Sequence, residues 1–214
     1  MEKKVMRYDV WEKLAPKYNG LWVQKYSLGP TRKEVKKIVL PLLAEQPELE
    51  ILEVGCGTGQ LIKEISGQYP KVHYLGIDVA ESMIEIAAKD NTGVNVNFRH
   101  CPVEDFTSGE KYDVILCTHA FPYFPKKAEV LKKLVGLCKE KSSVIIANSS
   151  TNSLKDFIIN LGLKATTSKA QYLSIEEMKK LFEEVGLELK DVKIIRERFY
   201  MPTIALFNCR LPKD

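Results

Sequence analysis

Three glycines at alternate positions, within Glu53-Val54-Gly55-Cys56-Gly57-Thr58-Gly59, form the segment of the chain best suited to ligand chemistry. The segment follows an apolar run typical of a buried strand and precedes a run typical of a helix, which begins near Gln60. Glycines let the chain turn sharply and bring backbone N–H groups close to a ligand. The positive N-terminal end of the following helix favours a negative or polar group. The pattern therefore predicts a ligand-binding turn.

The spacing of these glycines distinguishes the turn from two phosphate-binding turns. A dinucleotide fingerprint, G-x-G-x-x-G, would place its third glycine at position 60, where the chain has Gln60. A P-loop would need Lys-Ser or Lys-Thr after the glycines, and neither pair follows. The G-x-G-x-G variant of the turn remains.

Two carboxylates flank the turn at the ends of predicted strands. Glu53 stands in a buried strand, where an unpaired charge is costly, so it is expected to accept hydrogen bonds from the glycine turn or from a cationic ligand group. Asp78 ends the second strand, where a carboxylate is well placed to bind the two hydroxyls of a ribose. Alone, Asp78 would equally suit a helix N-cap; combined with the glycine turn, it predicts ribose binding.

One histidine is a candidate for proton transfer. His119 follows the fourth predicted strand, at the sheet edge where open α/β folds bind ligands. An ordinary imidazole pKa of ~6.5 suits a group that accepts a proton near neutral pH. His119 is thus either a general base or a polar wall of the site, whereas His73 and His100 are interpreted as structural.

The elements that position these residues follow from hydrophobic patterning. Short apolar runs alternate with amphipathic stretches, which predicts an α/β fold whose mostly parallel sheet has helices on both faces. No helix separates the last two strands, which therefore form an antiparallel hairpin. The seven predicted strands span residues 51–54, 72–78, 94–98, 112–117, 144–147, 187–195 and 199–209.

Helical patterns fall between and before these strands. Residues 3–46 are predicted to be helical, with breaks near 19–20 and 28–30, where glycines interrupt the pattern. A further helix over 128–138 has one apolar face. The helix within 174–186 begins with the capping box Ser-Ile-Glu-Glu and ends at a glycine C-cap.

Composition narrows the class of protein. The 214 residues carry a formal net charge of +4 without a basic stripe, so nucleic acid is not an expected partner. The five cysteines are scattered without a C-x-x-C pair, which argues against a metal site and against a disulfide framework. No apolar run reaches the ~18 residues of a membrane span, and no signal peptide is recognisable, so cytoplasmic residence is expected.

Four segments resemble the motifs of the Rossmann-like class I S-adenosylmethionine (SAM)-dependent methyltransferases. EVGCGTG resembles the first motif, LGIDVAESMIEIA the second, CPVEDF the adenine-binding segment and YDVILCTH the fourth-strand motif, together covering about residues 47–148. The resemblance implies that SAM is the cofactor and S-adenosylhomocysteine the product. The cofactor-binding residues that it implies are Glu53, Gly55, Cys56, Gly57, Gly59, Asp78, Val79, Met83, Val103, Glu104, Cys117, Tyr18 and Arg32.

The N-terminal segment resembles the lid of ubiquinone, menaquinone and phospholipid methyltransferases. Tyr8, Trp11, Tyr18 and Trp22 are expected either to cover the sulfonium, since aromatic faces attract cations, or to form a core stripe. Arg32 either pairs with the methionine carboxylate or is solvated. The chain is therefore expected to form one domain, with a lid at 1–46, a SAM-binding core at 47–148, an acceptor-side segment at 149–173 and a C-terminal helix and hairpin at 174–214.

The sequence departs from the family at two places that affect function. Pro102 offers no polar side chain to the adenine amino group, which leaves that contact to the backbone of Val103 or to Glu104. The Asn/Asp-Pro-Pro-Tyr/Phe tetrad of many nitrogen methyltransferases is replaced by Thr-His-Ala-Phe at 118–121. The expected function is methyl transfer to a small molecule, by a monomer or a homodimer. RNA or protein methylation and a non-enzymatic SAM-binding module remain alternatives. Arsenite methylation would need cysteines that converge on one site, and the spacing of the five cysteines gives no sign of this.

Overall fold

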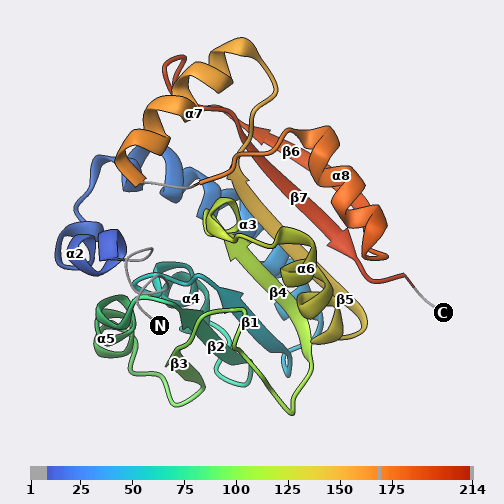
Figure 1. The fold of residues 1–214 in the computed structure, drawn as a ribbon. Coiled ribbons are helices and arrows are strands. Elements are labelled where there is room, and N and C mark those ends of the chain that lie inside the picture. Colours follow the sequence, from blue (N-terminus) through green and yellow to red (C-terminus); the bar gives the residue numbers. More distant parts are fainter. Residues whose placement is uncertain (1–8, 168–169, 213–214) are drawn as a thin grey trace.

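A single seven-stranded sheet forms the centre of the molecule (Figure 1), in a computed structural model that describes residues 9–167 and 170–212. The strand order is β3-β2-β1-β4-β5-β7-β6. Strands β1 to β5 are parallel, and β7 pairs antiparallel with both β5 and β6. The predicted fold class is confirmed. The strands are β1 Glu50–Val54, β2 His73–Asp78, β3 Val96–His100, β4 Tyr112–Thr118, β5 Cys138–Ser149, β6 Glu188–Ile195 and β7 Ile204–Arg210.

The order of the parallel strands reverses between β1 and β4. Chain order runs outward from β1 through β2 and β3 on one side, and through β4 and β5 on the other. At such a switch point the connections leave in opposite directions, and a crevice opens beyond the carboxyl ends of the strands. The glycine turn after β1 and His119 after β4 both lie at this crevice.

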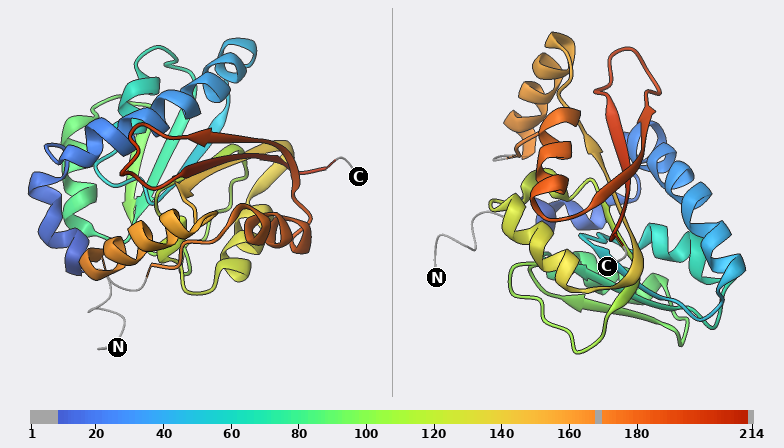
Figure 2. Two further views of the ribbon diagram at one scale, coloured as in Figure 1. Left: turned by 90° about the horizontal axis from the view of Figure 1, so that it is seen from above. Right: turned by 90° about the vertical axis from the view of Figure 1, so that its right-hand side faces the viewer.

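Helices cover both faces of the sheet because neighbouring residues of each strand point to opposite sides (Figure 2). Leu52 packs into a core with α6 and α8, whereas Ile51 packs into a second core with α3 and α4. The helices are α2 Asp9–Tyr18, α3 Gly29–Glu45, α4 Gln60–Ser66, α5 Glu81–Asp90, α6 Lys127–Gly136, α7 Leu154–Thr167 and α8 Ile175–Glu184, with a π-helical turn η1 Gln24–Leu28 and a 3-10 turn η2 Phe121–Tyr123.

Of the two breaks predicted within the N-terminal helical segment, the structure has the first and lacks the second. The chain turns after Tyr18, as predicted. The predicted break at 28–30 is wrong, because η1 continues directly into α3. Pro30 stands in the first turn of α3, and because it has no N–H it cannot donate a hydrogen bond back to η1. At Gly29 a Cβ would lie 2.6 Å from the carbonyl oxygen of Gln24, so only glycine fits the wide π turn.

Several predicted boundaries are corrected by the sheet. The helix predicted over 128–138 ends at Gly136, and Cys138 begins β5. β5 is longer than predicted because its polar first half also pairs with β4, across a bulge between Tyr112 and Val114. β3 begins at Val96 and β7 at Ile204, each later than predicted. The capping box at the start of α8 is confirmed.

Candidate functional site

The glycine turn has a left-handed backbone at each of its three glycines. Gly55, Gly57 and Gly59 have φ values of 71°, 54° and 71°. The backbone N–H groups of Gly55 and Cys56 donate to the Ile77 carbonyl at 2.8 and 3.0 Å, which ties the turn to β2. A Cβ at Gly55 would lie 2.2 Å from the Ala120 Cβ, so this position tolerates only glycine. At Gly57 the nearest atom to such a Cβ is Cε1 of Tyr18 at 3.5 Å.

Asp78 links the glycine turn to the start of α5. Its Oδ2 accepts a hydrogen bond from the Gly57 N–H at 2.8 Å, and its Oδ1 accepts one from the Ala80 N–H at 2.9 Å. Burial raises the pKa of Asp78, and these hydrogen bonds act in the opposite direction. The N-cap of α5 is Ala80. Asp78 is therefore a cavity-lining carboxylate rather than the cap itself.

Glu53 is a buried acid with an oxygen that lacks a partner. Among the described residues, no hydrogen-bond partner reaches its Oε2. Burial raises the pKa of Glu53 to about 8, although the Arg32 charge and a hydrogen bond with the Thr118 side chain lower it. A buried acceptor without a donor is costly. This carboxyl group is therefore suited to a cationic group supplied by a ligand beside the turn.

Arg32 lies across a small cavity from Glu53 and is held by other side chains. Its Nε donates to Glu64 Oε1 at 2.7 Å and its Nη1 donates to Gln24 Oε1 at 3.0 Å. Lys36 also pairs with Glu64, at 2.5 Å. These contacts orient the guanidinium at the wall of the small cavity beside the glycine turn.

His119 is held in an unusual backbone conformation at the end of β4. Its φ is 59°, a left-handed value that is uncommon for a residue with a side chain, and its N–H donates to the Ala147 carbonyl at 2.6 Å. The ring Nε2 lies 2.8 Å from Thr31 Oγ1, which is itself 2.9 Å from the Ser27 carbonyl. Burial lowers the pKa of His119 to about 4, so the ring is neutral at pH 7.

The Thr31 contact determines which ring nitrogen carries the hydrogen. A threonine hydroxyl has one hydrogen, and the Ser27 carbonyl can only accept it. Thr31 Oγ1 must therefore accept from an Nε2–H of His119. In the neutral ring Nδ1 then carries the lone pair, so His119 offers a hydrogen-bond acceptor to the cavity that it lines.

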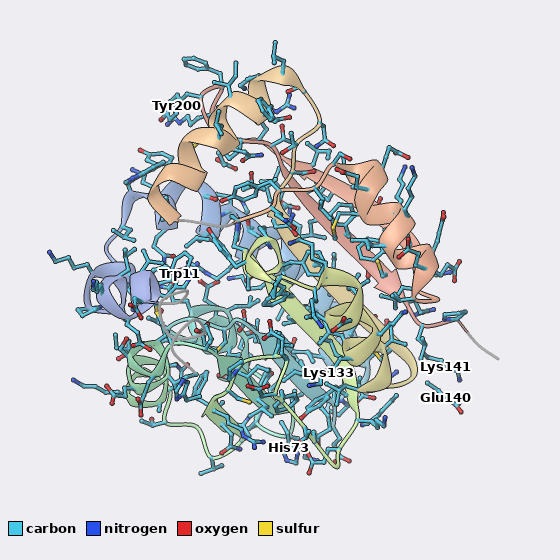
Figure 3. All side chains as sticks on the ribbon, viewed as in Figure 1. Trp11, His73, Lys133, Glu140, Lys141 and Tyr200 are labelled. Atoms are coloured by element: carbon cyan, nitrogen blue, oxygen red, sulfur yellow. The ribbon has the colours of Figure 1, made fainter. Side chains whose placement is uncertain are left out.

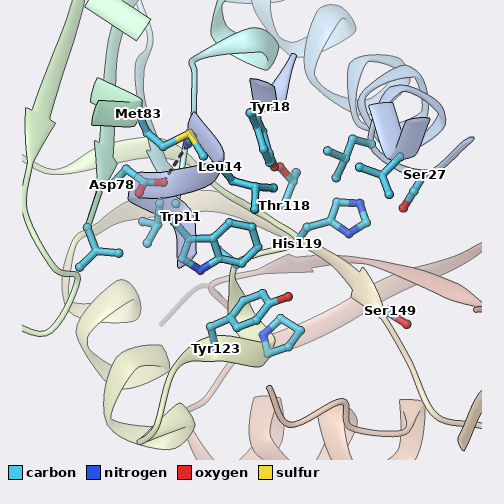
Figure 4. Close-up of a pocket in the computed structure, with 18 of the residues that line it drawn as sticks. Trp11, Leu14, Tyr18, Ser27, Asp78, Met83, Thr118, His119, Tyr123 and Ser149 are labelled. Atoms are coloured by element: carbon cyan, nitrogen blue, oxygen red, sulfur yellow. Dashed lines mark hydrogen bonds between the residues drawn. The ribbon is translucent and has the colours of Figure 1, made fainter. Parts of the chain in front are cut away.

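The glycine turn, Asp78 and His119 line one cavity of about 520 Å³ (Figure 4). Asp78 and Met83 lie at one end of the close-up, Trp11 lies between, and His119 and Ser149 lie toward the other end. Trp11 makes edge contacts with Tyr18 and Tyr123, at centroid distances of 6.5 and 5.1 Å. Other lining residues are Leu14, Leu21, Trp22, Ser27, Leu28, Val54, Val79, Cys101, Pro102, Val103, Glu104, Pro122, Phe124, Ile159, Tyr172, Tyr200, Met201 and Pro202.

The structure brings most of the sequence-predicted residues together. Gly55, Gly57, Asp78, Val79, Met83, Val103, Glu104 and Tyr18 line the main cavity, and Glu53, Cys56 and Arg32 line the small one beside it. Cys117 and Gly59 are not among the residues that line either cavity. Cys117 is packed in the hydrophobic core, and Gly59 lies against the Phe98 ring as the N-cap of α4. Tyr8 lies outside the described residues.

The two histidines interpreted as structural lie away from the cavity walls. His73 begins β2 and pairs with Glu50 through Nδ1 at 2.7 Å, at the end of the sheet far from Trp11 and Tyr200 (Figure 3). His100 Nε2 lies 3.0 Å from the Val79 carbonyl oxygen. His119 is thus the histidine that the described structure places at the cavity.

Sequence patterns missed part of the cavity wall. Tyr123 comes from the η2 turn, and Tyr200 and Met201 come from the loop between β6 and β7. Residues 199–209 were predicted to be strand, and the aromatic residues at 199 and 200 favour that prediction, but β7 begins only at Ile204. The described residues contain no cluster of three potential metal ligands, and none of their helices is long and apolar enough to cross a membrane.

A sheet with this strand order and a G-x-G-x-G turn at its switch point defines the methyltransferase class of Rossmann-like folds. The chain belongs to the methyltransferase domain family, whose model matches residues 45–197. Two solved structures share the fold over 99% of this chain and 100% of theirs, each at 18% identity. They are the plantazolicin methyltransferase BpumL in complex with a pentazolic analogue and SAH (TM-score 0.69), and magnesium protoporphyrin IX methyltransferase from Synechocystis PCC 6803 with bound SAH (TM-score 0.72).

Curated relatives are similar over much of the chain. Malonyl-[acyl-carrier protein] O-methyltransferase of Priestia megaterium is 27% identical over 180 residues, which cover 78% of this chain and 66% of the relative. Ubiquinone biosynthesis O-methyltransferase of Rickettsia canadensis is 29% identical over 159 residues, which cover 68% and 65% respectively. The chain thus spans slightly less than two thirds of the length of these relatives.

Proposed function

We propose that this protein binds SAM and transfers its methyl group to a small, largely apolar molecule. The observation that carries the proposal is the unpartnered Oε2 of Glu53, buried beside a G-x-G-x-G turn whose cavity also contains Asp78. The α-ammonium group of SAM is a cation of the kind that this oxygen lacks. The residues present therefore fit the cofactor.

The chain divides the binding of the cofactor among its own residues. Glu53 would hold the ammonium group, Asp78 the ribose hydroxyls, and Val103 and Glu104 the adenine. The backbone N–H groups of the glycine turn would face the polar middle of the ligand. SAM supplies a methyl group that is already activated as a sulfonium. The protein then has to orient the acceptor and exclude water.

The acceptor half of the cavity supports an apolar substrate. Among the described lining residues, the charged side chains are Asp78 and Glu104, both on the side of β2 and β3. The opposite half is lined by aromatic and aliphatic side chains, with hydroxyl groups and the neutral ring of His119 as its polar groups. An uncharged acceptor with one polar group beside His119 matches these walls.

The N-terminal segment, residues 1–46, supports the proposal as a lid. Glu12 in α2 accepts hydrogen bonds from the backbone N–H groups of Glu81 and Ser82, at 2.7 and 3.0 Å. The carboxylate therefore caps the N-terminus of α5, where negative charge is favoured. This contact holds Trp11 and Tyr18 over the cavity. We propose that the remaining segments have their expected roles within a single cytoplasmic domain, which acts as a monomer or a homodimer.

Calorimetry tests cofactor binding directly. We expect SAM and its demethylated product to bind and NAD not to bind. Asp78→Ala should weaken SAM by roughly 1–3 kcal/mol, the range for charge-assisted hydrogen bonds. Asp9→Ala, outside the cavity lining, serves as the matched control. Tight NAD binding without SAM binding would overturn the proposal, and a screen of acceptors with labelled SAM separates an enzyme from a SAM-binding module.

Proton release on binding tests the role of Glu53. With its pKa raised to about 8, the unliganded side chain is mostly protonated at pH 7. Because the pKa of Glu53 in the folded protein lies above its ordinary value of 4.5, proton binding to Glu53 contributes to folding stability. That contribution is fully present below pH 4.5 and is lost as the pH rises through 8. A cationic ligand group would ionise Glu53. We expect release of nearly one proton per SAM at pH 7, where the α-amino group of SAM is already mostly charged, measured in buffers of different ionisation enthalpy. The Glu53→Gln variant should release almost none at pH 7, and equal release by the two proteins would contradict the assignment.

A further inference from the structure

Helix α7 has its apolar residues on the outside. Leu154, Phe157, Ile158 and Leu161 recur at the spacing of one helical face and are 75%, 53%, 61% and 56% exposed. Two polar residues of the same helix, Asp156 and Asn160, are buried. A helix that only covered a core would show the reverse pattern. This outer face therefore has a role other than packing within the chain.

Hydrogen bonds on the buried side fix this orientation. Asp156 Oδ1 accepts from the Thr203 N–H at 3.0 Å, and its Oδ2 accepts from Ser153 Oγ at 2.9 Å. Asn160 Oδ1 accepts from Ser149 Oγ at 2.6 Å. Rotating the helix to bury its apolar face would leave these polar groups without partners, at a cost for each.

A second apolar group lies beside α7, on the loop between β6 and β7. Phe199 and Tyr200 are 81% and 52% exposed and contact each other edge to face, with centroids 5.3 Å apart. Figures 1 and 3 show this loop next to α7, and the bond from Thr203 to Asp156 joins them. Tyr200 and the exposed Trp22 also line the main cavity. The exposed apolar surface is therefore continuous with the cavity mouth.

Positive charges surround this surface. Lys155 on α7 and Arg196 and Arg198 on the loop are exposed, against one exposed acid in the loop, Glu197. The Arg198 guanidinium lies 5.4 Å from the ring centroid of Tyr26 in η1, and the Lys25 ammonium lies 5.3 Å from the same centroid. Projecting apolar side chains among lysines and arginines match the interface of an anionic bilayer.

We propose that the outer face of α7 and the Phe199-Tyr200 loop dock this protein on an anionic lipid bilayer. The cavity mouth then faces the membrane, and an apolar acceptor enters from the lipid without crossing water. The evidence for docking is the exposed apolar and basic surface itself and does not depend on the proposed function. Delivery of the acceptor from the lipid does rest on the proposed function. A bilayer is favoured over a second protein because the exposed apolar side chains come from two separate elements and have exposed lysine and arginine side chains beside them.

Vesicle co-sedimentation tests the docking. We expect the protein to bind vesicles of phosphatidylcholine with phosphatidylglycerol at least tenfold more tightly than vesicles of phosphatidylcholine alone. The variant Phe157→Gln/Ile158→Gln/Leu161→Gln should bind the anionic vesicles at least tenfold more weakly. Val94→Gln, which changes a fully exposed apolar residue before β3, is the matched control and should bind like the wild type. SAM affinity should be equal in all three proteins, which separates docking from cofactor binding.

Three results would overturn the proposal. The first is a wild-type protein that does not bind anionic vesicles, and the second is a triple variant that binds them as the wild type does. The third is a wild-type dimer in sedimentation velocity that the triple variant converts to a monomer without any vesicle binding by either. That result would assign the face to a second copy of the chain.

Discussion

Gly57→Val is expected to lower SAM affinity by ~100-fold or more, equivalent to about 2.7 kcal/mol. The backbone at Gly57 has a φ of 54°, and a Cβ there would lie 3.5 Å from Cε1 of Tyr18, on the cavity side of the turn. A branched side chain there fills the space through which the ligand approaches the backbone N–H groups. Calorimetric titration of the folded variant with SAM provides the measurement.

Two further glycine variants separate blocked binding from lost stability. Gly57→Ala carries a similar left-handed strain but a smaller side chain, so it should retain more affinity than the valine variant. Gly55→Ala places a Cβ 2.2 Å from Ala120, and it should lower the melting temperature more than either Gly57 variant. Wild-type affinity in a folded Gly57→Val protein would show that the ligand does not approach this turn.

The sequence predicted the central sheet because its signals are local. The apolar runs of β1 and β4 and the glycine turn each depend on a few adjacent residues. β5 was predicted too short because residues 139–143 are polar or charged. Cys138 and Ser143 pair with Tyr112 and Val114 on either side of the bulge, and such backbone pairing leaves no trace in hydrophobicity.

The cavity wall was only partly predictable, for a different reason. Thr31 and His119 are 88 positions apart, and no local pattern links a hydroxyl in α3 to an imidazole after β4. Likewise, Tyr200 reaches the cavity through the loop between β6 and β7. No helix was predicted over 154–167, so the burial of Asp156 and Asn160 on the inner side of α7 was not foreseen. Tertiary hydrogen bonds, which the sequence does not display, hold His119, Asp156 and Asn160 in place.

His119→Ala is expected to lower the turnover rate by ~100-fold or more and to leave SAM affinity nearly intact, if the acceptor is a hydroxyl, a thiol or an acidic carbon. Its tautomer offers Nδ1 to the cavity, and the pKa of about 4 keeps that nitrogen unprotonated through the neutral range. The rate should therefore fall with acid near pH 4 rather than near 6.5. For a neutral amine acceptor, the same variant should mainly raise KM.

Thr31 supplies the variant that tests the tautomer. Thr31→Val removes the oxygen that accepts the Nε2–H, so the imidazole can place its hydrogen on Nδ1 and no longer offer a lone pair to the acceptor. We expect a fall in kcat with little change in SAM affinity, and recovery in Thr31→Ser, which keeps the hydroxyl. An unchanged kcat and KM in His119→Ala would remove the imidazole from the site. An unchanged kcat in Thr31→Val alone would show that the ring keeps its tautomer without the Thr31 hydroxyl.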